Sequence, residues 1–168
     1  GNSLTGLGLF LRKFSFRAVC ACLWIAAPGF AQSSNDPAVL WSQATLYRDD
    51  WGVPHIYADN VRAMAFAFGY AQADDHLETM LLAYRAANGR LSEVYGETYA
   101  AADEFAIMMG HGDLARRAYA NADYTTRDLC EGFALGVNHW LVQHYNEVPP
   151  WAEGMQPTDV LAFMHYYF

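Results

Sequence analysis

The stretch VRAMAFAFGYAQA, residues 61–73, decides how this 168-residue chain folds. Apolar side chains follow one another there almost without a break, which favours a helix that is buried on most of its sides. Asp59 and Asn60 precede the stretch, and both are residue types that cap helix N-termini. After Asp74-Asp75, apolar residues recur every three or four positions as far as Asn88-Gly89, a typical C-terminal stop. The sequence therefore predicts helical structure over most of residues 61–88.

Upstream of this region, two β-prone runs at residues 44–48 and 53–57 flank the turn Asp49-Asp50-Trp51-Gly52. Two such runs around a turn that ends in Gly predict a β-hairpin. Pro54 has no N–H, so the second run is expected at a sheet edge or at the beginning of a strand. Residues 32–43 are polar with one Pro, and we expect them to form a flexible lead-in.

Downstream, the helical pattern continues but is interrupted by glycine and proline. Short helical turns are expected at residues 91–95 and 98–109, and Asp113 is expected to open a segment over 114–119. The clearest amphipathic helix runs from about residue 126 to 145. Its apolar stripe consists of Leu129, Phe133, Val137, Trp140, Leu141 and His144.

A last helix is predicted after Pro149-Pro150 has ended the amphipathic one. Pro157 and Thr158 mark its start, with Thr158 as the expected N-cap and residues 160–168 as its apolar body. The predicted fold class of this piece is therefore mostly α, with one short β-hairpin near its N-terminus followed by five or six helices.

The first 31 residues contain the three parts of a secretory signal peptide. Arg12, Lys13 and Arg17 precede the apolar run 18–27, and small residues follow at positions 29 and 31. Ten apolar residues are too few to span a bilayer, so we expect a leader that is cut after Ala31 and no stable membrane anchor. The alternative is a short buried N-terminal helix. Removal of the leader would leave seven Arg, no Lys and all 18 acidic residues.

The composition argues against several function classes. The formal net charge of −8 and the lack of clustered Lys or Arg in the mature part argue against binding to nucleic acid. The 3 Cys lack the spacing of a zinc site or a disulfide scaffold. Two of them lie in the predicted leader, and Cys130, on the apolar side of a helix, is expected to be a buried structural thiol.

No complete catalytic site is visible in the residues. After the leader only Ser33, Ser34, Ser42 and Ser92 remain, and none lies in the Gly-flanked elbow that exposes a catalytic serine in α/β-hydrolases. Asp103-Glu104 are adjacent, so on a helix they point in different directions and do not form an acid/base pair. The chain also has no glycine-rich loop for a phosphate group.

Metal binding has one candidate, the polar cluster of Asp74, Asp75, His76 and Glu78. It suits a zinc or hard-cation site, but capping and solvation of a helix start explain the same residues, and we favour that interpretation. The 6 His never form an HExxH pair, and His111-Gly112-Asp113 is typical of a turn followed by a new N-cap. No metal site is therefore assigned to this chain.

Four blocks in order resemble the penicillin acylase family: RDDWGVPHI at 48–56, FGYAQADD at 68–75, NGRLSEVYG at 88–96 and GVN at 136–138. The likeness is greatest to acyl-homoserine-lactone, aculeacin and cephalosporin acylases, and it covers residues 44–168. It implies an exported precursor that cuts itself into an α and a β chain and hydrolyses N-acyl amides. The implied whole-enzyme fold is the four-layer αββα sandwich of N-terminal-nucleophile hydrolases.

In that family the new N-terminal Ser of the β chain is the nucleophile and its own α-amine is the base. The resemblance therefore implies a truncated α-chain region at 44–168, no catalytic residue in this chain and a β chain of the same precursor as partner. It implies periplasmic or secreted location, a small acylated amide as substrate and no required cofactor. Calcium is possible in the full-length enzyme, with ligands outside this fragment.

The resemblance also implies roles for individual residues. Phe168 falls on a position that lines the acyl pocket in relatives, which makes it a substrate-binding candidate, and a core aromatic is the alternative. Asp49, Arg90 and Glu93 are expected either in a charge network against the β chain or at the surface. A second hypothesis from another class is a stand-alone exported helical binding module without catalysis.

Overall fold

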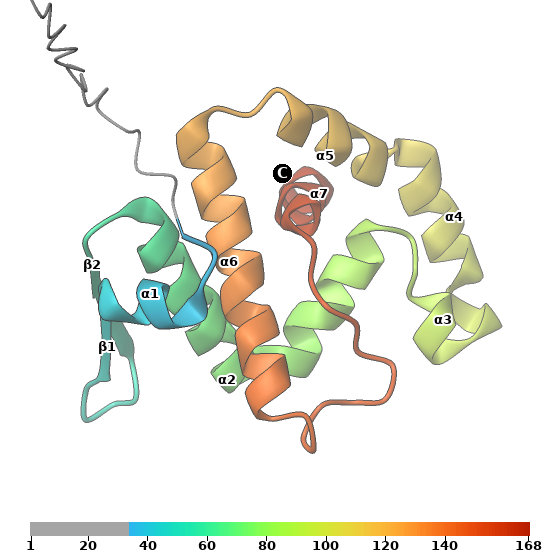
Figure 1. The fold of residues 1–168 in the computed structure, drawn as a ribbon. Helices are drawn as coiled ribbons and strands as arrows, with labels where there is room; N and C mark the ends of the chain where they lie inside the picture. The colour runs from blue at the N-terminus through green and yellow to red at the C-terminus, as the bar shows by residue number, and fades with distance from the viewer. Residues whose placement is uncertain (1–33) are drawn as a thin grey trace, which may run out of the picture. The chain divides into compact units, whose positions relative to one another are not determined.

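The computed structural model describes residues 34–168, so the predicted leader lies outside the described residues. Seven α-helices, one 3-10 helix and one two-stranded sheet make up this part, which confirms the predicted fold class (Figure 1). The elements are α1 Pro37–Ser42, β1 Ala44–Arg48, β2 Pro54–Ala58, α2 Val61–Ala87, α3 Ser92–Tyr95, the 3-10 helix η1 Glu97–Tyr99, α4 Ala100–Met109, α5 His111–Ala120, α6 Tyr124–Gln143 and α7 Pro157–Tyr167. Within residues 34–168, no helix is both long and apolar enough to cross a bilayer.

The segment expected to be a flexible lead-in differs from that expectation, because residues 37–42 form the helix α1. The Asp36 carboxylate accepts the N–H of Ala38 at 2.9 Å, and Pro37 occupies the first turn, where its missing N–H costs nothing. Leu40 is buried, and the Trp41 ring packs edge-on against Phe66 at 5.1 Å. This packing on α2 holds in place a segment whose composition alone suggested a loose chain.

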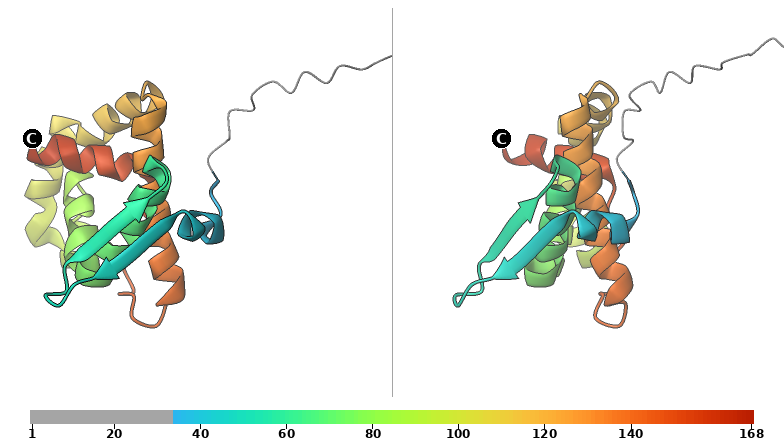
Figure 2. Two further views of the ribbon diagram at one scale, coloured as in Figure 1. Left: turned by 90° about the vertical axis from the view of Figure 1, so that its left-hand side faces the viewer. Right: turned by 60° about the vertical axis from the view of Figure 1, so that its left-hand side comes forward.

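The predicted hairpin is confirmed (Figure 2). Strands β1 and β2 pair antiparallel with Ala44 opposite Ala58 and Arg48 opposite Pro54. Pro54 begins β2, as expected for a residue without an N–H. The Asp49 side chain closes the turn by accepting the N–H groups of Trp51 and Val53, both at 2.9 Å.

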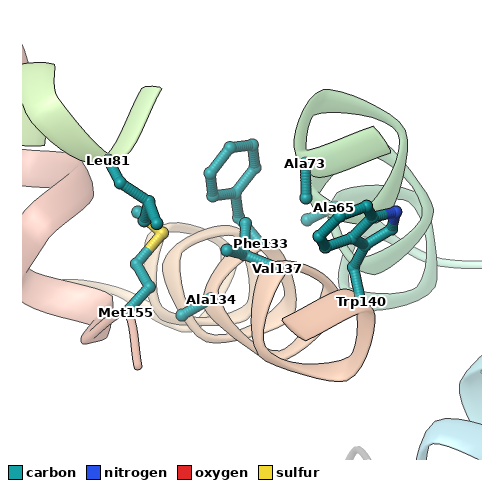
Figure 3. Close-up of a cluster of buried hydrophobic side chains, with 8 residues drawn as sticks. All are labelled: Ala65, Ala73, Leu81, Phe133, Ala134, Val137, Trp140 and Met155. Atoms are coloured by element: carbon teal, nitrogen blue, oxygen red, sulfur yellow. The ribbon is translucent and has the colours of Figure 1, made fainter. Parts of the chain in front are cut away.

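The core lies where α2 and α6 pack along each other, and it extends to the loop before α7 (Figure 3). Helix α2 brings Ala65, Ala73 and Leu81, and α6 brings a row of apolar side chains. That row, Phe133, Val137 and Trp140, comes from the predicted stripe and is buried. Leu129 and His144, the ends of the predicted stripe, are less covered than these three residues.

Helix α2 is a single long helix that contains one kink. Its N-cap is Asn60, whose side chain accepts the N–H of Ala63 at 2.9 Å, and its C-cap is Asn88, both as predicted. At His76 the backbone leaves helical geometry, with φ −144° and ψ 29°. The two predicted stretches are therefore two halves of one kinked helix, and Asp74 and Asp75 lie inside it rather than at a helix start.

Two predicted helix starts are corrected by the structure. Helix α5 begins at His111, two residues before Asp113, because Gly110 adopts a left-handed conformation (φ 72°) that ends α4. Helix α7 begins at Pro157 with Gln156 as N-cap. Gln156 and Asp159 form a capping box there, with the Gln156 N–H donating to the Asp159 carboxylate at 2.8 Å, so Thr158 lies inside the helix.

Candidate functional site

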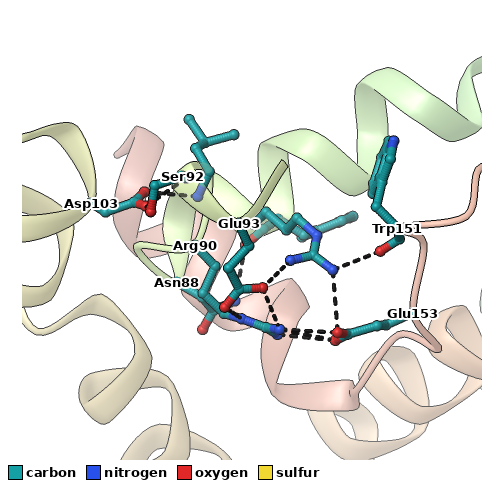
Figure 4. Close-up of polar contacts among 10 residues, drawn as sticks. Asn88, Arg90, Ser92, Glu93, Asp103, Trp151 and Glu153 are labelled. Atoms are coloured by element: carbon teal, nitrogen blue, oxygen red, sulfur yellow. Dashed lines mark hydrogen bonds and ion pairs between the residues drawn. The ribbon is translucent and has the colours of Figure 1, made fainter. Parts of the chain in front are cut away.

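The candidate nucleophiles in residues 34–168 are held in structural roles. The Ser92 hydroxyl donates to the Asp103 carboxylate, which also accepts the N–H groups of Leu91 at 2.8 Å and Ser92 at 2.7 Å (Figure 4). Burial by itself would raise the pKa of Asp103, but these three hydrogen bonds outweigh it and hold the pKa below its ordinary value. An ionised carboxylate of low pKa is a poor general base, so Ser92 is not activated.

Cys130 lies on α6 and is fully buried. Burial, together with the nearby Glu131 charge, raises the pKa of its thiol to about 11, so the thiol is neutral at physiological pH. The predicted role as a buried structural thiol is confirmed.

Of the predicted polar cluster of Asp74, Asp75, His76 and Glu78, the two aspartates form an ion-pair site. The Arg48 guanidinium, reaching from the end of β1, contacts both Asp74 and Asp75 at 2.9 Å. Asp74 also accepts the indole N–H of Trp140 at 3.1 Å. Among residues 34–168 no group of three or more His, Cys, Asp or Glu side chains is arranged to hold a metal ion. Asp74 and Asp75 thus tie the hairpin and α6 to α2, a role that neither metal binding nor helix capping describes.

A second charged network lies between the end of α2, α3 and the loop before α7 (Figure 4). Arg90 contacts Glu93 at 2.7 Å and Glu153 at 3.1 Å, and the buried Arg85 contacts the same two carboxylates. Arg85 also donates to the Trp151 carbonyl at 2.8 Å. Two members of the predicted charge network, Arg90 and Glu93, therefore do meet, but their partners lie within this chain.

The third predicted member, Asp49, lies elsewhere. Its carboxylate closes the hairpin turn and contacts His55 Nε2 at 3.0 Å. The bond from His55, opposed in part by burial and assisted by the turn N–H groups, lowers the pKa of Asp49 below its ordinary value. Asp49 therefore stabilises the turn and takes no part in the Arg90 network.

An apolar groove of about 560 Å³ lies between α2, α6 and α7. Cavities of this size are typical of sites for small organic ligands. Its apolar wall includes Phe68, Met80, Tyr84, Phe133, Phe163 and Met164. Its polar members Gln72, His76 and Thr79 all come from α2, at and on both sides of the kink at His76.

Phe168 follows the last turn of α7 and is 97% exposed in the described residues. It does not line the groove, whereas Tyr167, one position earlier, does. The prediction that Phe168 contacts substrate stays a prediction. Sequence reasoning did not single out Phe163, Met164 and Tyr167, although their spacing of one, three and four residues places them along one side of a helix.

His111 is an additional group that sequence reasoning assigned to a simple turn. It opens α5, is almost fully buried, and packs edge-on against the Tyr166 ring of α7 at 5.5 Å. Its Nδ1 atom is buried without a hydrogen-bond partner among residues 34–168. His111 therefore contributes mainly through packing between α5 and α7.

Comparison with known proteins places these features in context. The family model for penicillin amidase matches residues 43–168. Penicillin G acylase of Escherichia coli is 29% identical over 114 residues, which are 68% of this chain and 13% of that protein. An acyl-homoserine lactone acylase of Pseudomonas fluorescens is 28% identical over 128 residues, 71% of this chain and 16% of that protein. Aculeacin-A acylase of Actinoplanes utahensis is 33% identical over 113 residues, 58% of this chain and 14% of that protein.

A solved structure of a thermostable penicillin G acylase from Alcaligenes faecalis is also similar, with a TM-score of 0.62 and 26% sequence identity. The superposition covers 71% of this chain and 69% of that chain. This chain therefore spans less than a fifth of the length of the relatives named above, but it is nearly as long as the solved chain that it matches.

Proposed function

The chain belongs to the penicillin amidase family, and we propose that it forms the α-chain region of an exported acylase that hydrolyses the amide bond of an N-acyl substrate. Its relatives are acylases that act on penicillin, acyl-homoserine lactones and aculeacin. In the proposed enzyme the leader directs the precursor to the periplasm or the exterior, and cleavage separates this region from a β chain. The similarity to a solved chain of penicillin G acylase, at a TM-score of 0.62 and 26% sequence identity, supports the proposed family role.

One observation carries this proposal: Ser92 and Cys130, two candidate nucleophiles in residues 34–168, are held in structural roles. The Ser92 hydroxyl donates a hydrogen bond to the Asp103 carboxylate, and Cys130 is buried with a raised thiol pKa. The proposed chemistry therefore takes place on the β chain. Its N-terminal Ser attacks the amide carbonyl, and the α-amine of the same residue accepts the hydroxyl proton and passes it to the leaving amine. β-chain donors stabilise the oxyanion, and water then hydrolyses the acyl-enzyme.

The α-chain region contributes to binding of the acyl group in this proposal. The exposed Phe168 side chain follows the end of α7, and α7 itself forms one wall of the apolar groove. An acyl group of the β-lactam, acyl-homoserine-lactone or lipopeptide type presents the apolar surface that such side chains bury. No cofactor is required, and calcium, if bound, takes its ligands from outside residues 1–168.

The experiment is expression of the complete reading frame followed by amidase assays. We expect two chains after maturation and release of amine from phenylacetyl or fatty-acyl amides. Replacing the first Ser of the β chain by Ala should abolish hydrolysis but leave the protein folded. Its matched control is the same Ser→Ala change at Ser42, which has only an exposed hydrogen bond to the Val39 carbonyl. Full activity in the β-chain Ser→Ala variant would overturn the proposal.

A second candidate function rests on the groove itself. With about 560 Å³ and a mostly apolar wall, the groove suits a stand-alone exported module that binds a lipid or peptide without catalysis. The two functions differ in a direct observation, since a stop codon directly after Phe168 would leave only the binding module. A fluorescent fatty acid that binds the isolated chain with micromolar affinity would support that second function.

A further inference from the structure

Two of the four sequence blocks that resemble the family contribute polar side chains to one short segment, residues 151–159, which connects α6 to α7 and includes the first turn of α7. Asn138, from the GVN block, lies on α6, whereas Asn88 and Arg90, from the NGRLSEVYG block, follow the end of α2. Arg90 reaches the segment at Glu153 (Figure 4). Two stretches far apart in the sequence thus converge on the connection into α7.

The Asn138 side chain binds the backbone of Met155 in both directions. Its Nδ2 donates to the Met155 carbonyl at 2.9 Å, and its Oδ1 accepts the Met155 N–H at 2.7 Å. The Met155 side chain is itself buried in the core. A side-chain amide presents a donor and an acceptor side by side, so neither Asp nor Leu can replace both hydrogen bonds.

A second anchor lies at the first turn of α7. Asn88 Nδ2 donates to the Asp159 carboxylate at 3.1 Å and to the Tyr84 carbonyl at 2.9 Å, which joins the end of α2 to the start of α7. The Asp159 carboxylate also accepts the Gln156 N–H at 2.8 Å in the capping box. The start of α7 is therefore held by hydrogen bonds to both long helices, since Asn138 belongs to α6.

Beyond its first turn, α7 is held by few buried side chains. Among the described residues of this helix only Ala162 is buried, and residues 164–168 are all exposed. Near its middle the Phe163 ring packs on Tyr84 at 5.1 Å. The helix has 11 residues and is about 16 Å long, so a tilt of about 10° at its start moves its end by about 3 Å. The direction of α7 therefore depends on the polar anchors at its start.

We propose that Asn138 and Asn88 are positioning residues that set the direction of α7 and, through it, the acyl group that the enzyme prefers. The proposal rests on the proposed function, in which Phe168 and the α7 wall of the groove bury the acyl group. That wall includes Phe163 and Met164, whereas neither asparagine lines the groove. Misplacement of a binding group by about 1 Å can cost about a hundredfold in rate, so distant anchors can control selectivity.

The test is the acyl selectivity of the full-length enzyme, taken as the ratio of kcat/KM between its best and its poorest measurable substrate in a series of straight-chain acyl amides. The fraction of folded enzyme cancels from this ratio, so a merely destabilised variant leaves it unchanged. We expect Asn138→Asp, which keeps the acceptor for the Met155 N–H and loses the donor, to lower the ratio about fivefold or more.

Asn88→Ala should lower the ratio in the same way, and it decides the matter alone if Asn138→Asp fails to fold. The matched control is Asn121→Ala, which removes a comparable bond to the Arg117 carbonyl, 2.8 Å long, at the exposed end of α5 and should leave the ratio unchanged. An active enzyme whose ratio stays the same in the Asn138 and Asn88 variants, or falls equally in the control, refutes this inference alone. A wild-type enzyme that hydrolyses no acyl amide refutes the proposed function and the inference with it.

Discussion

At the scale of single residues, Asp103 shows how a role can be hidden in the sequence. Next to Glu104 it looks like one of two unrelated surface carboxylates, and the two side chains do point in different directions. In the structure Asp103 is buried on α4 and accepts three hydrogen bonds from Leu91 and Ser92 at the start of α3. Only the packing of α4 against α3 could reveal this, since the residues are 11 and 12 positions apart.

Replacement of Asp103 by Asn should destabilise the protein in a pH-dependent way. The lowered pKa means that the ionised carboxylate is favoured in the folded state, so its stabilisation is complete above the unfolded value near 4. It is lost as the pH falls through the lower folded value. We expect Asp103→Asn to cost about 1–3 kcal/mol at pH 7 and clearly less near pH 3.

Urea denaturation of the full-length protein at pH 7, 5 and 3 measures this difference, with Glu104→Gln as the control at an exposed neighbour. If the loss of unfolding free energy caused by Asp103→Asn stays constant down to pH 3, the assigned role of the carboxylate is contradicted.

At the scale of secondary-structure elements, the close approach of α2 and α6 depends on three glycines, Gly69, Gly132 and Gly136, of which Gly69 and Gly136 make the tightest contacts. A Cβ atom at Gly136 would lie 2.0 Å from the Phe66 carbonyl oxygen, and one at Gly69 would lie 2.2 Å from the Phe133 carbonyl oxygen. Both obstacles are backbone atoms of the facing helix, so a side chain at either position forces the helices apart. The GVN block at residues 136–138 carries part of the resemblance to the family, but its glycine is needed for the close contact between α6 and α2.

The variant Gly136→Ala should therefore lose stability although alanine is the better helix former. Overpacking of a tight helix contact costs about 1–3 kcal/mol or more, which exceeds the gain of up to 1 kcal/mol in helix propensity. We expect a Tm several degrees lower in the full-length protein. The matched control is Gly154→Ala, where the nearest atom to a new Cβ is a side-chain oxygen of Asn138 at 3.4 Å. An unchanged Tm for Gly136→Ala would show that the helices adjust without cost.

At the scale of the whole molecule, much apolar surface remains uncovered in the described chain. On α4 the side chains of Phe105, Ile107 and Met108 are exposed, and Trp51 at the hairpin turn is 90% exposed. Large apolar side chains are more often buried than exposed in folded proteins. Their exposure agrees with the proposal that residues 44–168 are one part of a larger enzyme.

The chain expressed alone should consequently be inactive and prone to aggregation. We expect residues 34–168 without a β chain to show no amidase activity, to bind a hydrophobic dye such as ANS and to aggregate at micromolar concentration. Coexpression with the β chain should suppress both dye binding and aggregation. Size-exclusion chromatography and thermal melting provide the measurement, and a monomer that melts cooperatively on its own would contradict the expectation.

The predictions from sequence succeeded where the physical cause is local. Periodicity, the Asn60 cap, the Asn88 stop and the turn before Pro54 depend on neighbours within a few residues, so the hairpin and the long helices were expected at nearly their observed positions. Helix boundaries failed at Asp113 and Thr158, because a left-handed Gly110 and the Gln156–Asp159 box begin the helices earlier. The penicillin amidase family was also indicated by short sequence blocks, because such motifs are visible without knowledge of the fold.

The tertiary structure alone decided which distant groups meet. Burial of Leu40 turned an apparently loose segment into α1, and Arg48 brought Asp74 and Asp75 into an ion-pair site instead of a cap. Arg90 contacts both Glu93 and Glu153, whereas Asp49 closes the hairpin turn. These contacts depend on packing free energy summed over elements far apart in the chain, and no local pattern encodes that sum.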